Sequence, residues 1–354
     1  GKAKELQKPS LLLEPQSTNL VTFSEDFNSS LYTETNITVT SDSIASPDGT
    51  KNASMLTDDS TNGQHRLTTS ALFTADGNNR CWSIFVKKGT SRYCAFNHVS
   101  GFTSAVNTIV FDFDTATYTA TGTTAYMDEV FPPQNYGNGW YKISFRSDIN
   151  SNSYTKLNIG LSSGPTYNDA SYAGTGNTMY IWGGQVEQQN YATSYIPTAG
   201  ATVTRNGEIC RNAGSAPVFN SEEGTFYAEI AALADDFTSR EMTLNGGNTS
   251  NRLVLSFNAN NQIRVDYTVS SSLQVRFNRA ADMTKFNKVA FKYKVNDFKL
   301  YLNGSLSGTD TSGSVPAAGT FNNFDFSNGS NNFNFYGRIK EIKAFRRTLT
   351  DSEM

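Results

Sequence analysis

Short segments in which apolar and polar residues alternate, separated by turn residues, recur along the whole chain. In the segment 81–86, for example, Trp82, Ile84 and Val86 fall on one face of an extended strand. An alternation with period two is typical of half-buried β-strands. No segment longer than about ten residues has helical periodicity; a short helix is expected only at Thr350, which opens a Thr-x-x-Glu capping box. The pattern predicts an all-β fold.

The spacing of these segments also predicts how the chain divides. A length of 354 residues suits two domains. Strands separated by frequent turns are typical of sandwiches and jelly rolls, and little alternates near residues 200–222, where glycines and a proline punctuate the chain. We predict two antiparallel β-sandwich (jelly-roll) domains in series. The predicted parts are an extended N-terminal lead-in (1–20), a first sandwich (21–205), a linker (206–221) and a second sandwich (222–354).

Composition supports the β prediction and excludes two classes of partner. The chain has 24 Phe and 17 Tyr, which suit pleated surfaces, and abundant Asn, Gly and Ser for the turns. Its net charge is −3 and no cluster of Lys and Arg stands out, which argues against nucleic-acid binding. No run of about 18 apolar residues is present, so we expect no membrane insertion.

The three cysteines, Cys81, Cys94 and Cys210, are predicted to be free thiols. If the strands on either side of the turn 88–91 pair as a hairpin, Cys94 faces a residue near Phe85 instead of Cys81, and a disulfide does not fit. Free thiols predict assembly in a reducing cytoplasm.

Several segments of the first half resemble a domain common in structural proteins of tailed bacteriophages. They occur in the expected order and together cover most of residues 12–205; they are 12–20, 24–27, 46–50, 137–141, 182–187 and 192–198. The resemblance implies a jelly roll similar to carbohydrate-binding modules, found on tail fibres and other parts of the virion surface.

The second half is similar to the laminin-G-like, concanavalin A-like family. Lys299–Gly304 looks like a strand followed by the Asn-Gly turn of that family, and Gly337–Ile342 with Leu349–Glu353 looks like its last strand and the start of a terminal helix. The resemblance covers about residues 222–354. The family is broad, so it predicts the fold better than the function.

No catalytic, cofactor-binding or metal site is predicted. Neither His65 nor His98 accompanies a nucleophile motif, and three scattered cysteines do not provide a zinc site. Glycoside hydrolysis needs only two carboxylates about 5–10 Å apart. Asp112 and Asp114 share a strand face and could meet that distance, but nothing around them predicts a cleft. We interpret them as a solvated face of an edge strand.

Calcium is the one cofactor that the second resemblance admits. Many laminin-G-like domains bind it through oxygen ligands, and acidic pairs occur in predicted loops at Asp58-Asp59, Glu222-Glu223 and Asp235-Asp236. However, the chain has no Asp-x-Asp-x-Asp-Gly loop. The prediction is therefore a protein without cofactors, with calcium as the alternative that the resemblance leaves open.

Three tyrosines are predicted glycan contacts: Tyr136, Tyr167 and Tyr172 lie in loops rich in Gly, Asn and Ser, where no core requires an aromatic ring. The alternative for each is a loop tyrosine that packs on its own sandwich. Trp140 and Trp182 are predicted to be core residues and not sugar platforms.

Together these features predict a non-enzymatic structural and adhesion protein of a phage virion. The first hypothesis is a tail-fibre or head-appendage subunit on the virion exterior that contacts host-surface glycans and other virion proteins. The family resemblance favours a homotrimer. One alternative is a capsid decoration or cement protein with a purely architectural role. Another is a polysaccharide depolymerase, which the lack of a repeat solenoid and of a carboxylate-rich cleft pattern disfavours.

Overall fold

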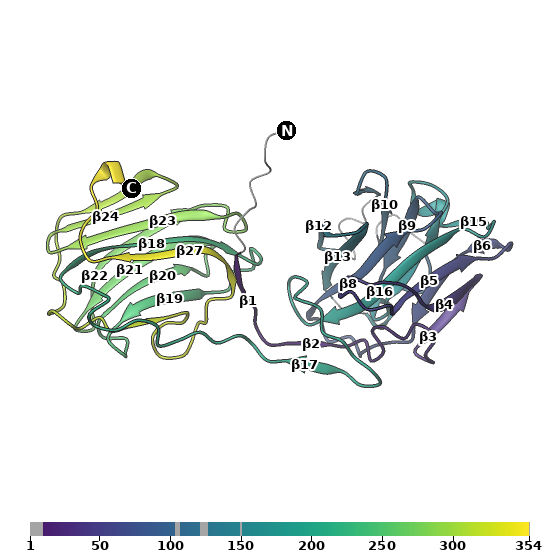
Figure 1. The fold of residues 1–354 in the computed structure, drawn as a ribbon, viewed down its shortest axis with the longest axis horizontal. Coiled ribbons are helices and arrows are strands. Elements are labelled where there is room, and N and C mark those ends of the chain that lie inside the picture. The colour runs from purple at the N-terminus through teal and green to yellow at the C-terminus, as the bar shows by residue number, and fades with distance from the viewer. Residues whose placement is uncertain (1–9, 103–106, 121–126, 149–150, 354) are drawn as a thin grey trace. The chain divides into compact units, whose positions relative to one another are not determined.

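The computed structural model describes residues 10–102, 107–120, 127–148 and 151–353 (Figure 1). Its strands pair in antiparallel ladders, and the prediction of an all-β protein built of antiparallel sandwiches is confirmed. The chain forms two compact units. The N-terminal unit is Gln16–Asn206, and the C-terminal unit combines the segment that ends at Pro15 with the residues from Gly207 onward.

The N-terminal unit contains two six-stranded sheets, named here after their central strands β8 and β9. The β8 sheet has the spatial order β12 (Glu129–Gly137), β13 (Trp140–Asp148), β8 (Asn79–Lys88), β16 (Thr178–Glu187), β5 (Ala53–Asp58) and β4 (Ile37–Ile44). The β9 sheet has the order β11 (Thr117–Ala120), β10 (Thr108–Asp112), β9 (Tyr93–Asn97), β14 (Asn158–Ser162), β7 (Arg66–Thr69) and β3 (Tyr32–Thr35). Two small ladders join β15 (Ser171–Ala173) to β6 (Asn62–Gln64) and β17 (Val203–Arg205) to β2 (Ser17–Asn19).

The core of this unit lies between its two sheets. Strand β8 contributes Trp82, Ile84 and Val86 to one cluster of buried apolar side chains, and β9 contributes Cys94 and Phe96 to the same cluster. These are alternate positions along each strand, as period-two patterning requires. The alternation predicted for 81–86 is therefore confirmed.

The pairing expected around Cys81 and Cys94 is wrong, although all three cysteines are free thiols as predicted. Strands β8 and β9 do not form a hairpin, because each belongs to a different sheet. Cys94 instead lies opposite Phe111 on one side and Leu161 on the other. Local alternation cannot distinguish a hairpin from a crossing between sheets, because both require the same pattern along each strand.

The C-terminal unit is a second sandwich. Its β18 sheet has the order β1 (Leu11–Leu13), β27 (Gly337–Phe345), β18 (Glu223–Ala232), β23 (Asn287–Lys294), β24 (Asp297–Leu302) and β25 (Ser305–Asp310). Its β20 sheet has the order β22 (Ser272–Ala280), β21 (Gln262–Val269), β20 (Arg252–Phe257), β19 (Arg240–Asn245) and β26 (Asn323–Asp325). The described residues also form three short 3-10 helices, η1 (Asn152–Tyr154), η2 (Tyr167–Ala170) and η3 (Asp351–Glu353). The last is the short helix expected after Thr350, whose backbone N–H donates to the Glu353 carboxylate at 2.8 Å.

The predicted lead-in and linker are divided between the units. Residues 11–13 of the lead-in form β1, the edge strand of the β18 sheet, where Leu11 lies opposite Ile339. Residues 17–19 pair instead with β17 inside the N-terminal unit. Residues 207–221 of the predicted linker belong to the C-terminal unit, and Phe219 is buried in its core. The N-terminal jelly roll is thus inserted between the first strand and the rest of the C-terminal sandwich.

Leu13→Ala tests this insertion. Leu13 is 5% exposed within the C-terminal core, so its truncation should lower the free energy of unfolding of that unit by about 2–5 kcal/mol. The three tryptophans, Trp82, Trp140 and Trp182, all lie in the N-terminal unit. The loss should therefore appear in the circular-dichroism transition and not in the tryptophan-fluorescence transition. Leu12→Ala, at a 39% exposed position of the same strand, is the control and should change little. Equal effects of the two substitutions would contradict the assignment of β1.

Candidate functional site

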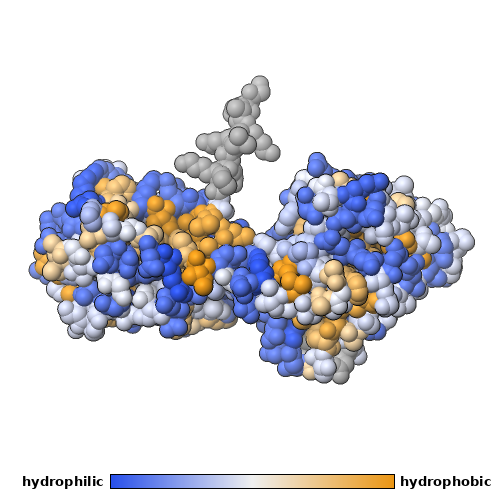
Figure 2. Space-filling view, turned by 60° about the horizontal axis from the view of Figure 1, so that its bottom comes forward, coloured by the Kyte–Doolittle hydropathy of each residue, from blue (hydrophilic) through white to orange (hydrophobic). Residues whose placement is uncertain are grey.

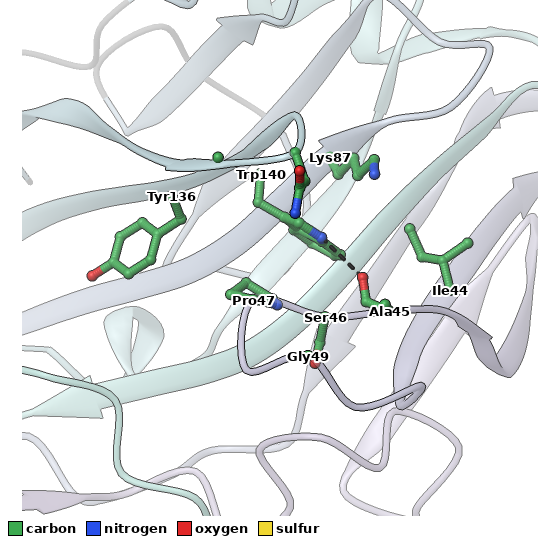
Figure 3. Close-up of a pocket in the computed structure, with 10 residues that line it drawn as sticks. Ile44, Ala45, Ser46, Pro47, Gly49, Lys87, Tyr136 and Trp140 are labelled. Atoms are coloured by element: carbon green, nitrogen blue, oxygen red, sulfur yellow. Dashed lines mark hydrogen bonds between the residues drawn. The ribbon is translucent and has the colours of Figure 1, made fainter.

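A hollow of about 530 Å³ lies on the N-terminal unit, at the end of the β8 sheet where β8 and β13 pair at Lys87 and Trp140 (Figure 3). We call it the Tyr136 pocket. Its volume is in the range of small-molecule sites, which is about 300–1,000 Å³. The residues that line it are Ile44, Ala45, Ser46, Pro47, Gly49, Lys87, Tyr136, Gly137, Asn138 and Trp140.

One wall of the pocket is the hairpin between β12 and β13. Gly137, Asn138 and Gly139 have φ values of 82°, 49° and 80°, a run of left-handed residues that glycine and asparagine tolerate best. The Asn135 carboxamide accepts a hydrogen bond from the Gly137 N–H at 2.8 Å. This sequence allows a tight turn that leaves Asn138 exposed at its tip.

The opposite wall is the loop that follows β4, which is held by an internal network. The Asp48 carboxylate accepts hydrogen bonds from the Ser46 hydroxyl at 2.6 Å and from the Thr50 N–H at 2.8 Å, and the Ser46 N–H donates to the Thr50 carbonyl at 2.9 Å. Burial favours the protonated acid, but these hydrogen bonds outweigh it and lower the pKa of Asp48 below its ordinary value. The wall is therefore preorganised, and the carboxylate faces its own turn and does not line the pocket.

The floor between these walls is Trp140. Its indole N–H donates to the Ala45 carbonyl at 3.1 Å, which ties the hairpin to the loop (Figure 3). Its ring is 2% exposed and belongs to a cluster with Phe85 and Trp182 on the outer face of the β8 sheet. Trp140 and Trp182 are thus buried, as predicted, although in this outer cluster and not in the core between the sheets. A ring so enclosed does not serve as a stacking platform.

Tyr136 is the exposed aromatic residue of the pocket. It is 49% exposed, and its ring packs edge-to-face on Phe85 with 4.8 Å between centroids. It lines the pocket together with Asn138, Lys87 and residues of the 44–49 loop. The lining contains donors, acceptors and one aromatic platform but no carboxylate. It can bind a polar molecule with an apolar face, and it provides no pair of acids for hydrolysis.

The other two predicted contacts lie elsewhere in the unit and do not line this pocket. Tyr167 opens η2 and is half-buried. Tyr172 donates its hydroxyl to the Asp58 carboxylate at 2.6 Å, and its ring lies 4.5 Å from that of His65. Burial, with the neighbouring Asp58, raises the pKa of Tyr172 above its ordinary value. Tyr172 therefore matches the alternative that we kept open, a tyrosine packed on its own sandwich.

The remaining lining residues were not predicted as contacts. The motifs of both walls, 46–50 and 137–141, did stand out in the sequence as parts of the phage-domain resemblance. Their meeting across Trp140 depends on the register of β13 with β8, in which Trp140 lies opposite Lys87. The sequence places Lys87 at the end of a strand with alternating residues. That alternation does not predict which loops cover the outer face of the sheet.

The predicted solvated edge-strand face is wrong for Asp112, whereas the Asp114 side chain is 42% exposed and lies just beyond the end of β10. Strand β10 lies between β11 and β9, and the Asp112 side chain is 3% exposed. The Arg92 guanidinium forms a two-point ion pair with Asp112, at 3.1 and 2.8 Å, and lowers the pKa of that carboxyl to about 2. Asp114 pairs with Lys88 and Arg92. A carboxyl that stays ionised cannot act as the general acid of glycoside hydrolysis, so Asp112 does not supply that function.

His98 and Asp58 have structural surroundings. His98 is fully buried against Trp82 and Phe145, and burial lowers its pKa to about 3. Asp58 is enclosed by the N–H groups of residues 175–177. Among the described residues, no three His, Cys, Asp or Glu side chains are grouped as metal ligands would be.

Comparison with known proteins identifies the second sandwich. Residues 212–354 match the concanavalin A-like lectin/glucanases superfamily, in its laminin-G form. The C-terminal unit has the laminin-G/concanavalin A-like fold. That part of the resemblance is confirmed. A search of curated proteins found no match.

Several solved structures of carbohydrate-binding modules and lectins are similar. The CBM40 module of a Ruminococcus gnavus IT-sialidase is 20% identical, with a TM-score of 0.34, over 41% of this chain and 92% of its own. The CBM66 module from Bacillus subtilis is 9% identical, with a TM-score of 0.27, over 36% and 76%. A SAP-like pentraxin from Limulus polyphemus is 11% identical, with a TM-score of 0.32, over 40% and 71%.

Two surface properties complete the description. Among the described residues, no helix has the length and apolarity to cross a membrane. On the face shown in Figure 2, both units are largely hydrophilic and apolar residues gather in small patches.

The ion pair of Asp112 predicts a pH dependence of stability. Its pKa is about 2 in the folded protein against an ordinary 3.8, so the folded state binds the proton more weakly than the unfolded chain. The stabilisation is present above pH 4 and is lost as the pH falls towards 2. Asp112→Asn should therefore unfold more easily than the wild type at pH 7, with a difference that shrinks between pH 4 and pH 2. Urea unfolding of the two proteins across this range measures it, and a difference independent of pH would contradict the ion pair.

Proposed function

We propose that this protein is a non-enzymatic glycan-binding protein and that its N-terminal unit binds a saccharide in the Tyr136 pocket. The observation that carries the proposal is the half-exposed Tyr136 ring beside amide, ammonium and backbone groups in a preorganised hollow. The family of the C-terminal unit, which includes lectins, supports the same class of function. No cofactor is part of the proposal.

The chemistry of the pocket suits a sugar. A pyranose ring has an apolar face of C–H groups, which packs on an aromatic ring, and a rim of hydroxyl groups, which need hydrogen-bond partners. Tyr136 supplies the aromatic surface, while Asn138 and the backbone of the 44–49 loop supply donors and acceptors. Because Asp48 and Trp140 already hold both walls, little ordering entropy is lost on binding.

We further propose that the protein works on the exterior of a phage virion, as a tail-fibre or head-appendage subunit that attaches to host-surface glycans. This rests on the sequence resemblance of residues 12–205 to virion structural domains. In this setting it assembles in the bacterial cytoplasm with other virion proteins, consistent with three free thiols, and the family habit favours a homotrimer.

Tyr136→Ala tests the site. Loss of the ring should weaken binding to the oligosaccharides that the wild type binds on a glycan array by about tenfold or more, because the stacking surface is gone. Tyr136→Phe keeps that surface and should bind nearly as the wild type does. Calorimetric titration with the best array ligand measures the affinities.

Tyr167→Ala is the matched control, since it removes a tyrosine of the same unit outside the pocket. Binding that is lost in Tyr167→Ala but kept in Tyr136→Ala would move the site elsewhere. If no glycan binds and virions that lack the protein have weakened capsids, the architectural alternative of a decoration protein replaces the adhesion proposal.

A further inference from the structure

We infer that the Tyr136 pocket selects acidic saccharides, in which a sugar carboxylate is bound by Lys87. The inference rests on the proposed glycan-binding function of the same pocket and adds the class of ligand. Its starting point is the charge of the lining: among the ten lining residues, Lys87 is the one that carries a charge.

The Lys87 side chain is positioned by the strands around it. It lies on the outer face of the β8 sheet, opposite Trp140 on β13 and Tyr180 on β16. Its methylene groups run beside the backbone of Gly139, where an added Cβ would lie 3.5 Å from Cε. The aliphatic stem is thus packed along the hairpin, and the ammonium group is left at the pocket.

No acidic side chain of the described residues forms an ion pair with Lys87, whereas its neighbours are engaged. Lys88 pairs with Asp114, and the Lys142 ammonium donates to the Thr193 carbonyl at 2.6 Å. The carboxylate closest in the chain to the pocket lining is that of Asp48, which accepts from Ser46 and Thr50 inside its own turn. The positive charge at the pocket is therefore not neutralised from within the lining.

The arrangement specifies how an acidic saccharide would lie. In Figure 3, Tyr136 and Lys87 lie on opposite sides of Trp140 and their side chains extend away from each other, so an oligosaccharide with one sugar ring on Tyr136 would have to extend across Trp140 to bring a carboxylate to Lys87. A charge-assisted hydrogen bond to a carboxylate is roughly twice as strong as a neutral one. A neutral saccharide would leave the Lys87 ammonium group bonded to water alone. The acidic saccharide should therefore bind more tightly than the neutral one.

Matched ligand pairs test the inference. Oligogalacturonate is compared with its methyl ester, and sialyllactose with lactose, by calorimetric titration of the full chain. At least one acidic member should bind about tenfold more tightly than its neutral partner, and raised salt should reduce that difference.

The variants separate charge from fold. Lys87→Gln should remove the preference, and Lys87→Arg should retain most of it. Lys288→Gln, at an exposed lysine of the C-terminal unit, removes the same net charge and should leave the preference unchanged. Tryptophan fluorescence of each variant confirms that the N-terminal unit is folded.

The outcomes distinguish this inference from the proposed function. If acidic and neutral members bind equally well and Tyr136→Ala abolishes both, the acidic preference is wrong and the glycan site stands. If Lys87→Gln still prefers the acidic saccharide, Lys87 is not the residue that binds the carboxylate. If no member of either pair binds, both proposals fail.

Discussion

The structure of the N-terminal unit depends on one constraint: its central strand β8 is covered on both faces. Residues 80–86 are all buried, so this strand cannot have one face in water as the outer strands of a sandwich often do. Its inward side chains pack between the two sheets, and Phe85 on the other face packs with Trp140 and Trp182. The Tyr136 pocket lies beside this outer cluster, because Trp140 belongs to both.

Hydrogen bonds of buried polar groups hold the segments that cover this outer face. Glu187 on β16 is fully buried, and its carboxylate accepts hydrogen bonds from the Ser17 hydroxyl at 2.6 Å and the Thr193 N–H at 3.0 Å. Lys142 donates to the carbonyl of the same Thr193. Charged groups can be buried only with such partners, and each pairing fixes the covering segment in one position. The aromatic cluster and this polar network together hold the segments that cover the outer face.

Sequence patterns predicted the parts of this arrangement that are local. The alternation in 81–86 predicted a strand with the correct inward face, and Asn138 with its flanking glycines predicted a tight turn. Pairing between distant segments has no local pattern: nothing near Leu11 indicates that it lies opposite Ile339. For the same reason, the sequence predicted Tyr136 as an exposed aromatic residue but did not predict that the 44–49 loop lines the same pocket.

Hydrogen–deuterium exchange of the full chain, with and without saturating oligosaccharide from the tightest-binding matched pair, tests the central claim most directly. The Tyr136 pocket predicts slower exchange on binding at amides of residues 44–50 and 136–140, with the C-terminal unit unchanged. Protection confined to the C-terminal unit, or to segments of the N-terminal unit outside these two walls, would contradict it.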